Sequence, residues 1–327
     1  MRRDTMEFPE SELNTKLETI ACPFCNSDRF ELLRKVGDRF KLSVAREYQI
    51  VACVNCNFVY LNPRPKVEHI SDFYANGAYQ PFLSTRSAVS GLDRVYLWVR
   101  NLMVGRKRRV IEKFVKCGKL LDIGCGTGEF LREMEKHGWS VAGLEKDEKA
   151  AEFAQKQYGL KVTTLEFSQM PYSENSFDVV TLWHVLEHLY NPLQILRELR
   201  TRLKDSGVLV IAMPNINSFD ARFYKANWVA LDAPRHVQHF VPASLQAFCS
   251  ASGFEIIQRR QLPFDALYNC LFSELLIARN SGKRFLLLFL LLRAFVIAMI
   301  SLAVGSSLRR RESRNGSSML YVIKPTR

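Results

Sequence analysis

The sequence predicts an α/β fold, built on a doubly wound and mostly parallel β-sheet. Between residues 119 and 215, short apolar runs alternate with amphipathic stretches, which is the order of strands and crossover helices in such a sheet. Two Cys-x-x-Cys pairs near the N-terminus predict a small metal-binding unit in front of it. A long apolar run at 285–308 predicts a helical insertion near the end. With 327 residues, the chain can form a full α/β domain and a smaller appendage.

The first unit is predicted to be a zinc ribbon at 21–65, preceded by a loose or disordered segment at 1–20. Its strands are expected at 30–36, 49–53 and 58–61. Its candidate ligands are the cysteines of the two pairs, Cys22, Cys25, Cys53 and Cys56. Four thiolates favour Zn²⁺ in a closed tetrahedral site with no open position for chemistry. We therefore expect structural zinc, with an iron site or metal-free thiols as the alternatives.

Helices at 66–118 are expected to connect this ribbon to the sheet. A short helix is predicted near 66–74, and a long basic helix at 92–115. The run of basic residues at 106–109 is typical of a solvated helix face.

The sheet is expected to begin with a strand that ends in Leu-Leu-Asp-Ile-Gly-Cys-Gly-Thr-Gly, at 120–128. Glycines at such a turn permit unusual backbone angles and let a nucleotide-like ligand approach the backbone. Their spacing differs from the G-x-G-x-x-G of dinucleotide sites. Asp122 would repel a pyrophosphate but suits a ligand with a cationic amine, such as S-adenosylmethionine. Glu145 ends the next predicted strand, at about the 20-residue separation expected of a ribose-binding carboxylate.

From this motif onwards, the chain resembles the class I S-adenosylmethionine-dependent methyltransferases. The resemblance continues through residues 170–180, 184–192 and 203–215, which look like the family's fourth strand, the helix after it and the fifth strand. It covers residues 92–262 and 319–327, and it implies a seven-stranded Rossmann-like sheet with S-adenosylmethionine as the cofactor. Within the family, the chain is most similar to the ubiquinone-biosynthesis O-methyltransferases and to enzymes of surface-glycan and antibiotic-sugar pathways.

The resemblance also implies domain limits and cofactor contacts. The methyltransferase core is expected at 119–262, the apolar insertion at 263–318 and the last core strand at 319–327. The methionine end of the cofactor is expected at the glycine turn, at Asp122, Gly124, Cys125, Gly126 and Gly128. The ribose is expected at Glu145, the adenine at Glu166 and Phe167, and the transfer centre at Trp183 and His184.

Methyl transfer to a hydroxyl needs an aligned donor and acceptor and a base of near-neutral pKa, for which histidine is the usual choice. His184 follows the fourth predicted strand, where ligands of parallel sheets bind. Glu187 and His188 come next. Either they hold the helix in place, or they bind a divalent metal, as the resembling residues of the ubiquinone-pathway enzymes do. His236 and His239 lie in a segment expected to cover the acceptor, so at least one is a candidate base or acceptor ligand.

The apolar run at 285–308 carries one charge, Arg293, and basic residues flank it. The strands predicted at 254–261 and 319–323, on either side, must reach the same sheet. A single membrane crossing would separate them, and Arg293 would be costly in a lone span. We expect shallow insertion beside anionic lipid, with a homodimer face or a lid as the alternatives.

The formal net charge of +13 favours an anionic membrane or a phosphorylated glycolipid as partner, and no nucleic-acid partner is expected. The polar N-terminus predicts no signal peptide, hence a cytoplasmic protein, peripheral on the inner face of the membrane. The function expected is O-methylation of a hydroxyl of a glycan, glycolipid or other membrane-proximal acceptor. The alternatives are a soluble methyltransferase for a quinone or secondary metabolite, and a binding protein that holds the cofactor without turnover.

Overall fold

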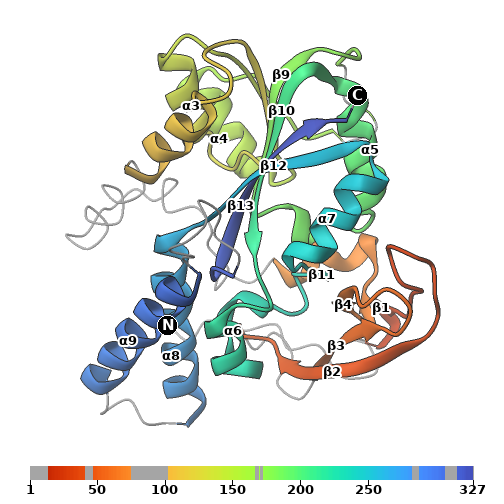
Figure 1. Cartoon of the computed structure of the whole chain (residues 1–327), viewed down its shortest axis with the longest axis vertical. Helices are drawn as coiled ribbons and strands as arrows, with labels where there is room; N and C mark the ends of the chain where they lie inside the picture. The colour runs from red at the N-terminus through yellow and green to blue at the C-terminus, as the bar shows by residue number, and fades with distance from the viewer. Residues whose placement is uncertain are drawn as a thin grey trace.

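The computed structural model describes residues 14–40, 47–74, 102–165, 169, 172–281, 287–305 and 315–326. A seven-stranded sheet lies at its centre, with strand order β12-β13-β10-β9-β6-β7-β8 (Figure 1). Its strands are β6 (Lys119–Ile123), β7 (Ser140–Leu144), β8 (Val162–Thr163), β9 (Phe177–Trp183), β10 (Leu203–Pro214), β12 (Phe254–Gln261) and β13 (Ser318–Pro325). β13 runs antiparallel to β10 and β12, whereas the pairs from β10 through to β8 are parallel. The predicted α/β fold with a mostly parallel sheet is confirmed.

The sheet is wound in two directions from its middle. The chain enters at β6, continues outward through β7 to β8, and returns to the other side of β6 with β9 and β10. The strand order therefore reverses between β6 and β9, where doubly wound sheets bind ligands at the carboxyl ends of the strands. The glycine motif after β6 and His184 after β9 both lie at this point.

Helices cover both faces of the sheet, with α3 (Glu129–Lys136) and α4 (Glu148–Tyr158) on one side (Figure 1). α4 ends at Gly159, whose φ of 69° gives the left-handed backbone of a helix C-terminus. The other side carries α5 (Pro192–Arg202) and α7 (Pro242–Ala251) (Figure 1). Both begin with proline, whose fixed φ suits the first turn of a helix.

Local structure differs from the sequence prediction in two places. After β9 the chain forms a short 3₁₀ turn, η4 (Leu186–His188), and α5 follows only at Pro192, so His184 is not on a helix. His184 instead has a positive φ of 58°. A second 3₁₀ helix, η1 (Val67–Phe73), stands where a short helix near 66–74 is expected. Of the predicted basic helix at 92–115, residues 102–115 are described, and the helix they form ends at residue 111.

The cysteine-rich unit is a four-stranded sheet of order β11-β4-β3-β2. It contains β2 (Phe30–Gly37), β3 (Glu47–Cys53) and β4 (Val59–Leu61), close to the predicted strands. Its fourth strand, β11 (Gln238–His239), comes from the segment after β10 and pairs with β4. Within the segment expected to be loose, β1 (Leu17–Glu18) pairs with β5 (Arg64–Pro65). The ribbon and the core are therefore joined by backbone hydrogen bonds.

The remaining helices lie near the carboxyl end of β10. α6 (Phe219–Tyr224), η5 (Lys225–Asn227) and η6 (Val229–Leu231) follow that strand. The apolar insertion forms two long helices that pack against each other, α8 (Pro263–Ser281) and α9 (Leu287–Gly305), and it projects beyond the edge of the sheet (Figure 1). Leu288–Gly305 is long and apolar enough to cross a membrane by length and composition, with a mean hydropathy of 2.4.

Candidate functional site

The glycine turn that follows β6 is held at the sheet edge by backbone contacts. The Gly124 N–H donates to the Leu144 carbonyl at 2.7 Å, which ties the turn to the end of β7. Gly124 has a φ of 69°, and a Cβ there would lie 2.5 Å from the Cγ2 of Val185, the residue after His184. The turn is thus packed directly against the segment that leaves β9. This contact places the predicted cofactor site next to His184.

Two carboxylates face this turn from the ends of β6 and β7. Asp122 is 2% exposed and accepts a hydrogen bond of 2.5 Å from Thr181 Oγ1. Burial raises the pKa of Asp122 to about 7, although Thr181 and Lys107 oppose the shift. Glu145 accepts hydrogen bonds from the Gly126 N–H at 2.8 Å and the Asp147 N–H at 2.9 Å. Glu145 therefore lies over the glycine turn, as a ribose-binding carboxylate must.

The same region already accommodates a cation. Lys107 Nζ lies 4.4 Å from the ring centroid of Trp183, whose ring meets Phe130 edge to face at 5.6 Å. Burial lowers the pKa of Lys107, and the charge of Asp122 opposes this shift. An aromatic face beside a carboxylate is a favourable environment for a sulfonium or an ammonium group. These residues fit the charge of S-adenosylmethionine. Glu166 and Phe167, predicted to meet the adenine, lie outside the described residues.

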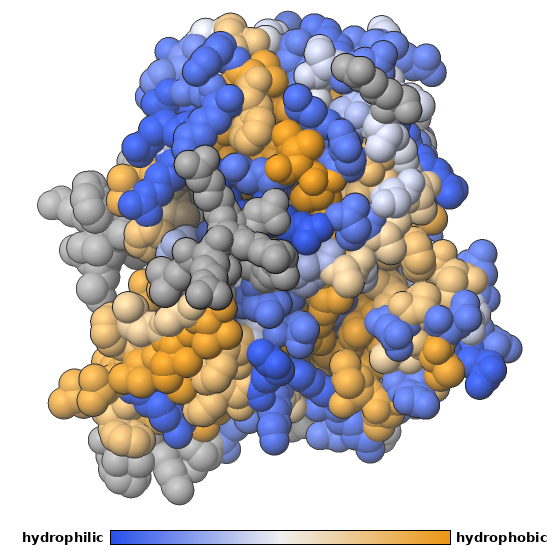
Figure 2. All heavy atoms as spheres, viewed as in Figure 1, coloured by the Kyte–Doolittle hydropathy of each residue, from blue (hydrophilic) through white to orange (hydrophobic). Residues whose placement is uncertain are grey.

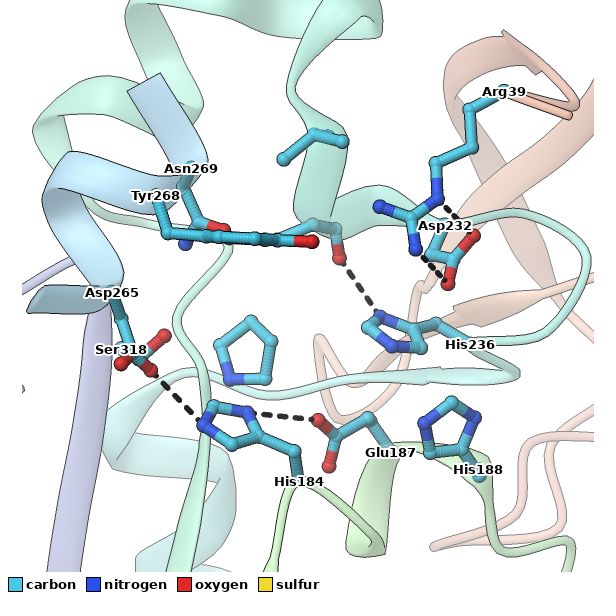
Figure 3. Close-up of a pocket in the computed structure, with 13 residues that line it drawn as sticks. Arg39, His184, Glu187, His188, Asp232, His236, Asp265, Tyr268, Asn269 and Ser318 are labelled. Carbon is cyan, nitrogen blue, oxygen red and sulfur yellow. Dashed lines mark hydrogen bonds and ion pairs between the residues drawn. The ribbon is translucent and has the colours of Figure 1, made fainter. Parts of the chain in front are cut away.

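A cavity of about 320 Å³ is lined by His184, the residue that precedes Val185 (Figure 3). Its lining comes from the segment after β9, the last residue of β10, η6 with the loop that follows it, the segment after β2, α8 and the first residue of β13. The side chains that matter here are His184, Glu187, His188, His236, Asp265 and Tyr268. Of the three predicted histidines, the structure brings His184 and His236 to this cavity. His239 does not line it.

His184 is held between two carboxylates. Its Nε2 lies 3.0 Å from Asp265 Oδ2, and its Nδ1 lies 3.5 Å from Glu187 Oε1 (Figure 3). Although burial favours the neutral ring, these carboxylates raise the pKa of His184 to about 10. A histidine that stays protonated at neutral pH cannot accept a proton. His184 is therefore suited to orient Asp265 and to place a positive charge beside the cavity.

His236 has the opposite character. Its Nδ1–H donates to the Ala230 carbonyl at 2.8 Å, which leaves Nε2 unprotonated in the neutral ring. Burial lowers the pKa of His236 to about 4, and the nearby His188 adds to the lowering. The ring is 8% exposed and lines the cavity. A neutral imidazole of fixed tautomer is the form that a general base requires.

Glu187 lies between these two histidines and is 2% exposed. Although burial opposes its ionisation, His184 and His236 hold its pKa below the usual value. Neither carboxylate oxygen has a hydrogen-bond donor among the described residues beyond the long ion pair with His184. Glu187, His188 and His236 offer donor atoms within 4.8 Å of one another, so the predicted alternative of a divalent metal keeps a geometric basis.

A buried ion-pair network connects this cavity to the ribbon. Arg235, fully buried, donates to Asp38 at 2.7 Å and pairs with Asp232 at 2.8 Å. Asp38 follows β2, and His239 in β11 pairs with Val59 of β4. Burial lowers the pKa of His239 to about 3. Arg235 and His239 thus fasten the segment that carries His236 to the ribbon.

Sequence reasoning missed the contribution of α8 and β2 to this cavity. Asp265 and Tyr268 lie on the first turns of α8, within an insertion that the apolar pattern marked as separate. Arg39, which pairs with Asp232 at 2.8 Å, comes from the ribbon. Asp265 carried a usable signal, since it is an isolated acid at the start of an apolar helix. No sequence signal pointed to Arg39, because its contact with Asp232 depends on how the ribbon packs against the rest of the protein.

The four predicted cysteine ligands meet in one place. Cys22 Sγ lies 3.5 Å from Cys56 Sγ, Cys25 Sγ lies 3.5 Å from Cys53 Sγ, and all four sulfurs lie within 4.8 Å of one another. Tetrahedral zinc with Zn–S bonds of about 2.3 Å places sulfurs about 3.8 Å apart. The arrangement therefore fits a zinc ion.

The backbone around the cysteines supports the same interpretation. The Asn26 N–H donates to the Cys22 carbonyl and the Asn57 N–H donates to the Cys53 carbonyl, each at 2.9 Å. Asn26 and Asn57 have φ values of 58° and 59°. The two cysteine pairs thus form the same turn, and each turn presents its sulfurs to the other.

Comparison with known proteins finds methyltransferases among the relatives of this chain. A methyltransferase-domain family model matches residues 98–259. The mitochondrial ubiquinone biosynthesis O-methyltransferase of Schizosaccharomyces pombe is 32% identical over 40% of this chain and 48% of its own. The ubiquinone biosynthesis O-methyltransferase of Actinobacillus pleuropneumoniae serotype 7 is 26% identical over 46% of this chain and 70% of its own. A SAM-dependent methyltransferase structure from Archaeoglobus fulgidus has 21% identity and a TM-score of 0.46, over 69% of this chain and 94% of that one.

The matched region, the strand order of the sheet and the glycine turn after β6 lead to one assignment. Residues 98–259 are a class I S-adenosylmethionine-dependent methyltransferase domain. The chain spans about half the length of the first of these curated relatives.

Proposed function

We propose that the chain is an active O-methyltransferase in which His236 is the general base. The single observation that carries the proposal is a neutral histidine of fixed tautomer in the cavity that His184 also lines. The cofactor would be held by the predicted contacts at Asp122, the glycine turn, Glu145 and Trp183. When bound, S-adenosylmethionine supplies an electrophilic methyl group.

The residues of this chain would act on the acceptor. A hydroxyl in the cavity would give its proton to Nε2 of His236. The resulting imidazolium would be stabilised by the buried carboxylate of Glu187, which already has two histidine neighbours in the cavity. Protonated His184 would stay paired with Asp265 and fix one wall of the cavity. Positioning of the acceptor and removal of one proton are the two contributions that this geometry offers.

For the acceptor, we propose a hydroxyl on a glycan, a glycolipid or another molecule near the cytoplasmic face of the membrane. The net charge of +13 and the apolar insertion support this choice. The names of the relatives favour a quinone-like small molecule as the alternative acceptor. We further propose one structural zinc ion at Cys22, Cys25, Cys53 and Cys56, on the basis of their distances.

The test is release of S-adenosylhomocysteine on a panel of glycolipids, glycans and quinols, with purified full-length protein. His236→Gln should lower kcat by a factor of about 10²–10⁴, because the general base is removed. Its affinity for S-adenosylmethionine, measured by calorimetry, should not change. The matched control is His137→Gln, an exposed histidine at the end of α3. Turnover by His236→Gln at the wild-type rate would overturn the role of His236, and the absence of turnover on every acceptor would favour a non-catalytic cofactor-binding protein.

A further inference from the structure

The apolar side of α9 faces outward. Phe295 is 55% exposed, and apolar side chains on the neighbouring turns are also exposed. They are Leu288 (82%), Phe289 (58%), Leu292 (62%), Val296 (45%), Met299 (47%) and Val304 (50%). α8 continues this surface with Phe272, 40% exposed, and Tyr268, 49% exposed. Figure 2 shows the corresponding apolar patch over the part of the molecule where Figure 1 places α8 and α9. We call these residues the hairpin face.

Two polar residues of α9, Arg293 and Ser301, are paired with acidic residues of α8 and α6. Arg293, the one charged residue of α9, makes two contacts with Glu274 of α8, at 2.5 and 2.7 Å. Glu274 is fully buried, and Tyr224 also donates to it, at 3.0 Å. Ser301 donates to buried Asp220 at 2.7 Å. The charge that argued against burial in a membrane is therefore balanced by a buried carboxylate of α8, although 36% of the Arg293 side chain remains exposed.

α9 is therefore apolar on both sides, because Leu290, Ala294 and Ile297 are buried in the protein while the hairpin face is exposed. A helix on the surface of a soluble protein instead turns polar residues outward. Exposed apolar patches of this kind mark an interaction surface. The charges next to it in the sequence indicate which surface it meets. Lys283 and Arg284 precede α9, and three consecutive arginines follow it at 309–311. Apolar side chains bordered by basic residues suit a bilayer with anionic headgroups, whereas a second positively charged copy of the chain would be repelled.

We propose that the hairpin face docks on an anionic lipid bilayer and thereby presents the cavity to acceptors held at the membrane surface. The connection is direct, because α8 carries both the hairpin face and a wall of the cavity. Asp265 on its first turn pairs with His184, and Tyr268 belongs to both surfaces. Since β12 and β13 return both ends of the hairpin to one sheet, the helices lie in the membrane interface and do not cross it. The acceptor class that follows is amphiphilic, and this part rests on the proposed function.

The test is flotation of the purified full-length protein with phosphatidylcholine vesicles that contain or lack phosphatidylglycerol. Wild type should float with the anionic vesicles and much less with the neutral ones. The triple variant Leu288→Glu, Phe289→Glu, Leu292→Glu should lose at least tenfold in vesicle affinity. The matched control makes the same three changes on the ribbon, at Phe30, Leu32 and Leu33, which are also exposed. It should float like wild type. Calorimetry should show the same cofactor affinity for all three proteins, which establishes that they are folded.

Two results would overturn the proposal. One is wild type that stays out of the vesicle fraction; if it is also a dimer that the triple variant dissociates, the hairpin face is an interface between copies of the chain. The other is equal loss of flotation in the ribbon control. His236→Gln keeps these results separate from the proposed chemistry, because it should float normally while losing turnover.

Discussion

Two histidines on the same cavity hold opposite charge states, for reasons that lie in their contacts. His184 has two carboxylate neighbours, Asp265 and Glu187, and is protonated. The Nδ1–H of His236 donates a hydrogen bond to a backbone carbonyl, and the ring is buried, so His236 is neutral. Residue type alone cannot separate these cases, because the partner of His184 lies on α8. The sequence therefore proposes both histidines as catalytic, and the geometry favours His236.

The charge states can be measured directly. At pH 7, ring ¹⁵N chemical shifts should show His184 protonated on both nitrogens and His236 neutral with its proton on Nδ1. Asp265→Asn removes one of the two carboxylates that stabilise the His184 cation, so the pKa of His184 should fall while His236 remains neutral. A charged His236 at pH 7 in the wild-type protein would exclude it as the base.

At the scale of elements, the sequence was sufficient to predict those helices, strands and turns whose formation depends on local residues. The strand predicted at 254–261 matches β12, and the two Cys-x-x-Cys pairs form turns as their spacing indicates. The prediction of a helix at 184–192 was wrong, because His184 has a left-handed backbone conformation and the helix begins only at Pro192. β11 could not be predicted, since it is two residues long and exists only by pairing with β4. Tertiary pairing of this kind leaves no periodicity in the sequence.

The pairing of β11 with β4 has a measurable consequence. Cys53→Ser removes one proposed zinc ligand, so metal analysis should show nearly complete loss of zinc from a wild-type protein that holds about one ion per chain. The ribbon carries β4 and Asp38, which hold the segment around Arg235 and His236. We therefore expect a higher KM for the acceptor and an unchanged affinity for S-adenosylmethionine, because no residue of the glycine turn lines the cavity.

Asp38→Asn is the companion variant. It should keep its zinc but weaken the ion pair with Arg235, with a loss of about 1–3 kcal/mol in the free energy of unfolding, because a buried hydrogen-bonded charge loses a partner. Wild-type protein without metal, or a Cys53→Ser variant with normal zinc, would contradict the site. Equal acceptor KM in all three proteins would show that the ribbon does not position the cavity.

At the scale of the whole molecule, the cavity is assembled from parts far apart in the chain. Arg39 comes from the ribbon and His184 from the edge of the sheet. His236 comes from the segment after η6, and Asp265 comes from the apolar hairpin. Residues 98–259 carry the glycine turn, Asp122 and Glu145, where the sequence predicts the cofactor. The cavity is shared between that region, which carries His184 and His236, and the additions to it, which carry Arg39 and Asp265. For the cavity, the sequence offered candidates without their geometry.

Because these parts enclose neutral histidines, the stability of the whole molecule should depend on pH. His239 titrates at about 6.5 when unfolded, whereas burial lowers its folded pKa to about 3. Above pH 6.5, His239 is neutral in both the folded and the unfolded protein. Below it the unfolded chain binds a proton that the native protein does not, so the free energy of unfolding falls by about 1.4 kcal/mol per pH unit until the folded pKa is reached.

His236 adds the same slope down to about pH 4, while Asp122, with a folded pKa raised to about 7, opposes it between pH 7 and its unfolded pKa of about 3.8. His239→Gln removes one of the two histidine contributions without touching the cavity lining. Urea unfolding at pH 6 and pH 4 should therefore show a smaller loss of stability in this variant than in wild type, by about 1.4 kcal/mol for each pH unit. The exposed-histidine variant His137→Gln should keep the wild-type slope. If His239→Gln and wild type lose equal stability over this interval, His239 is protonated in the folded protein and the segment around it is more open to water than its burial indicates.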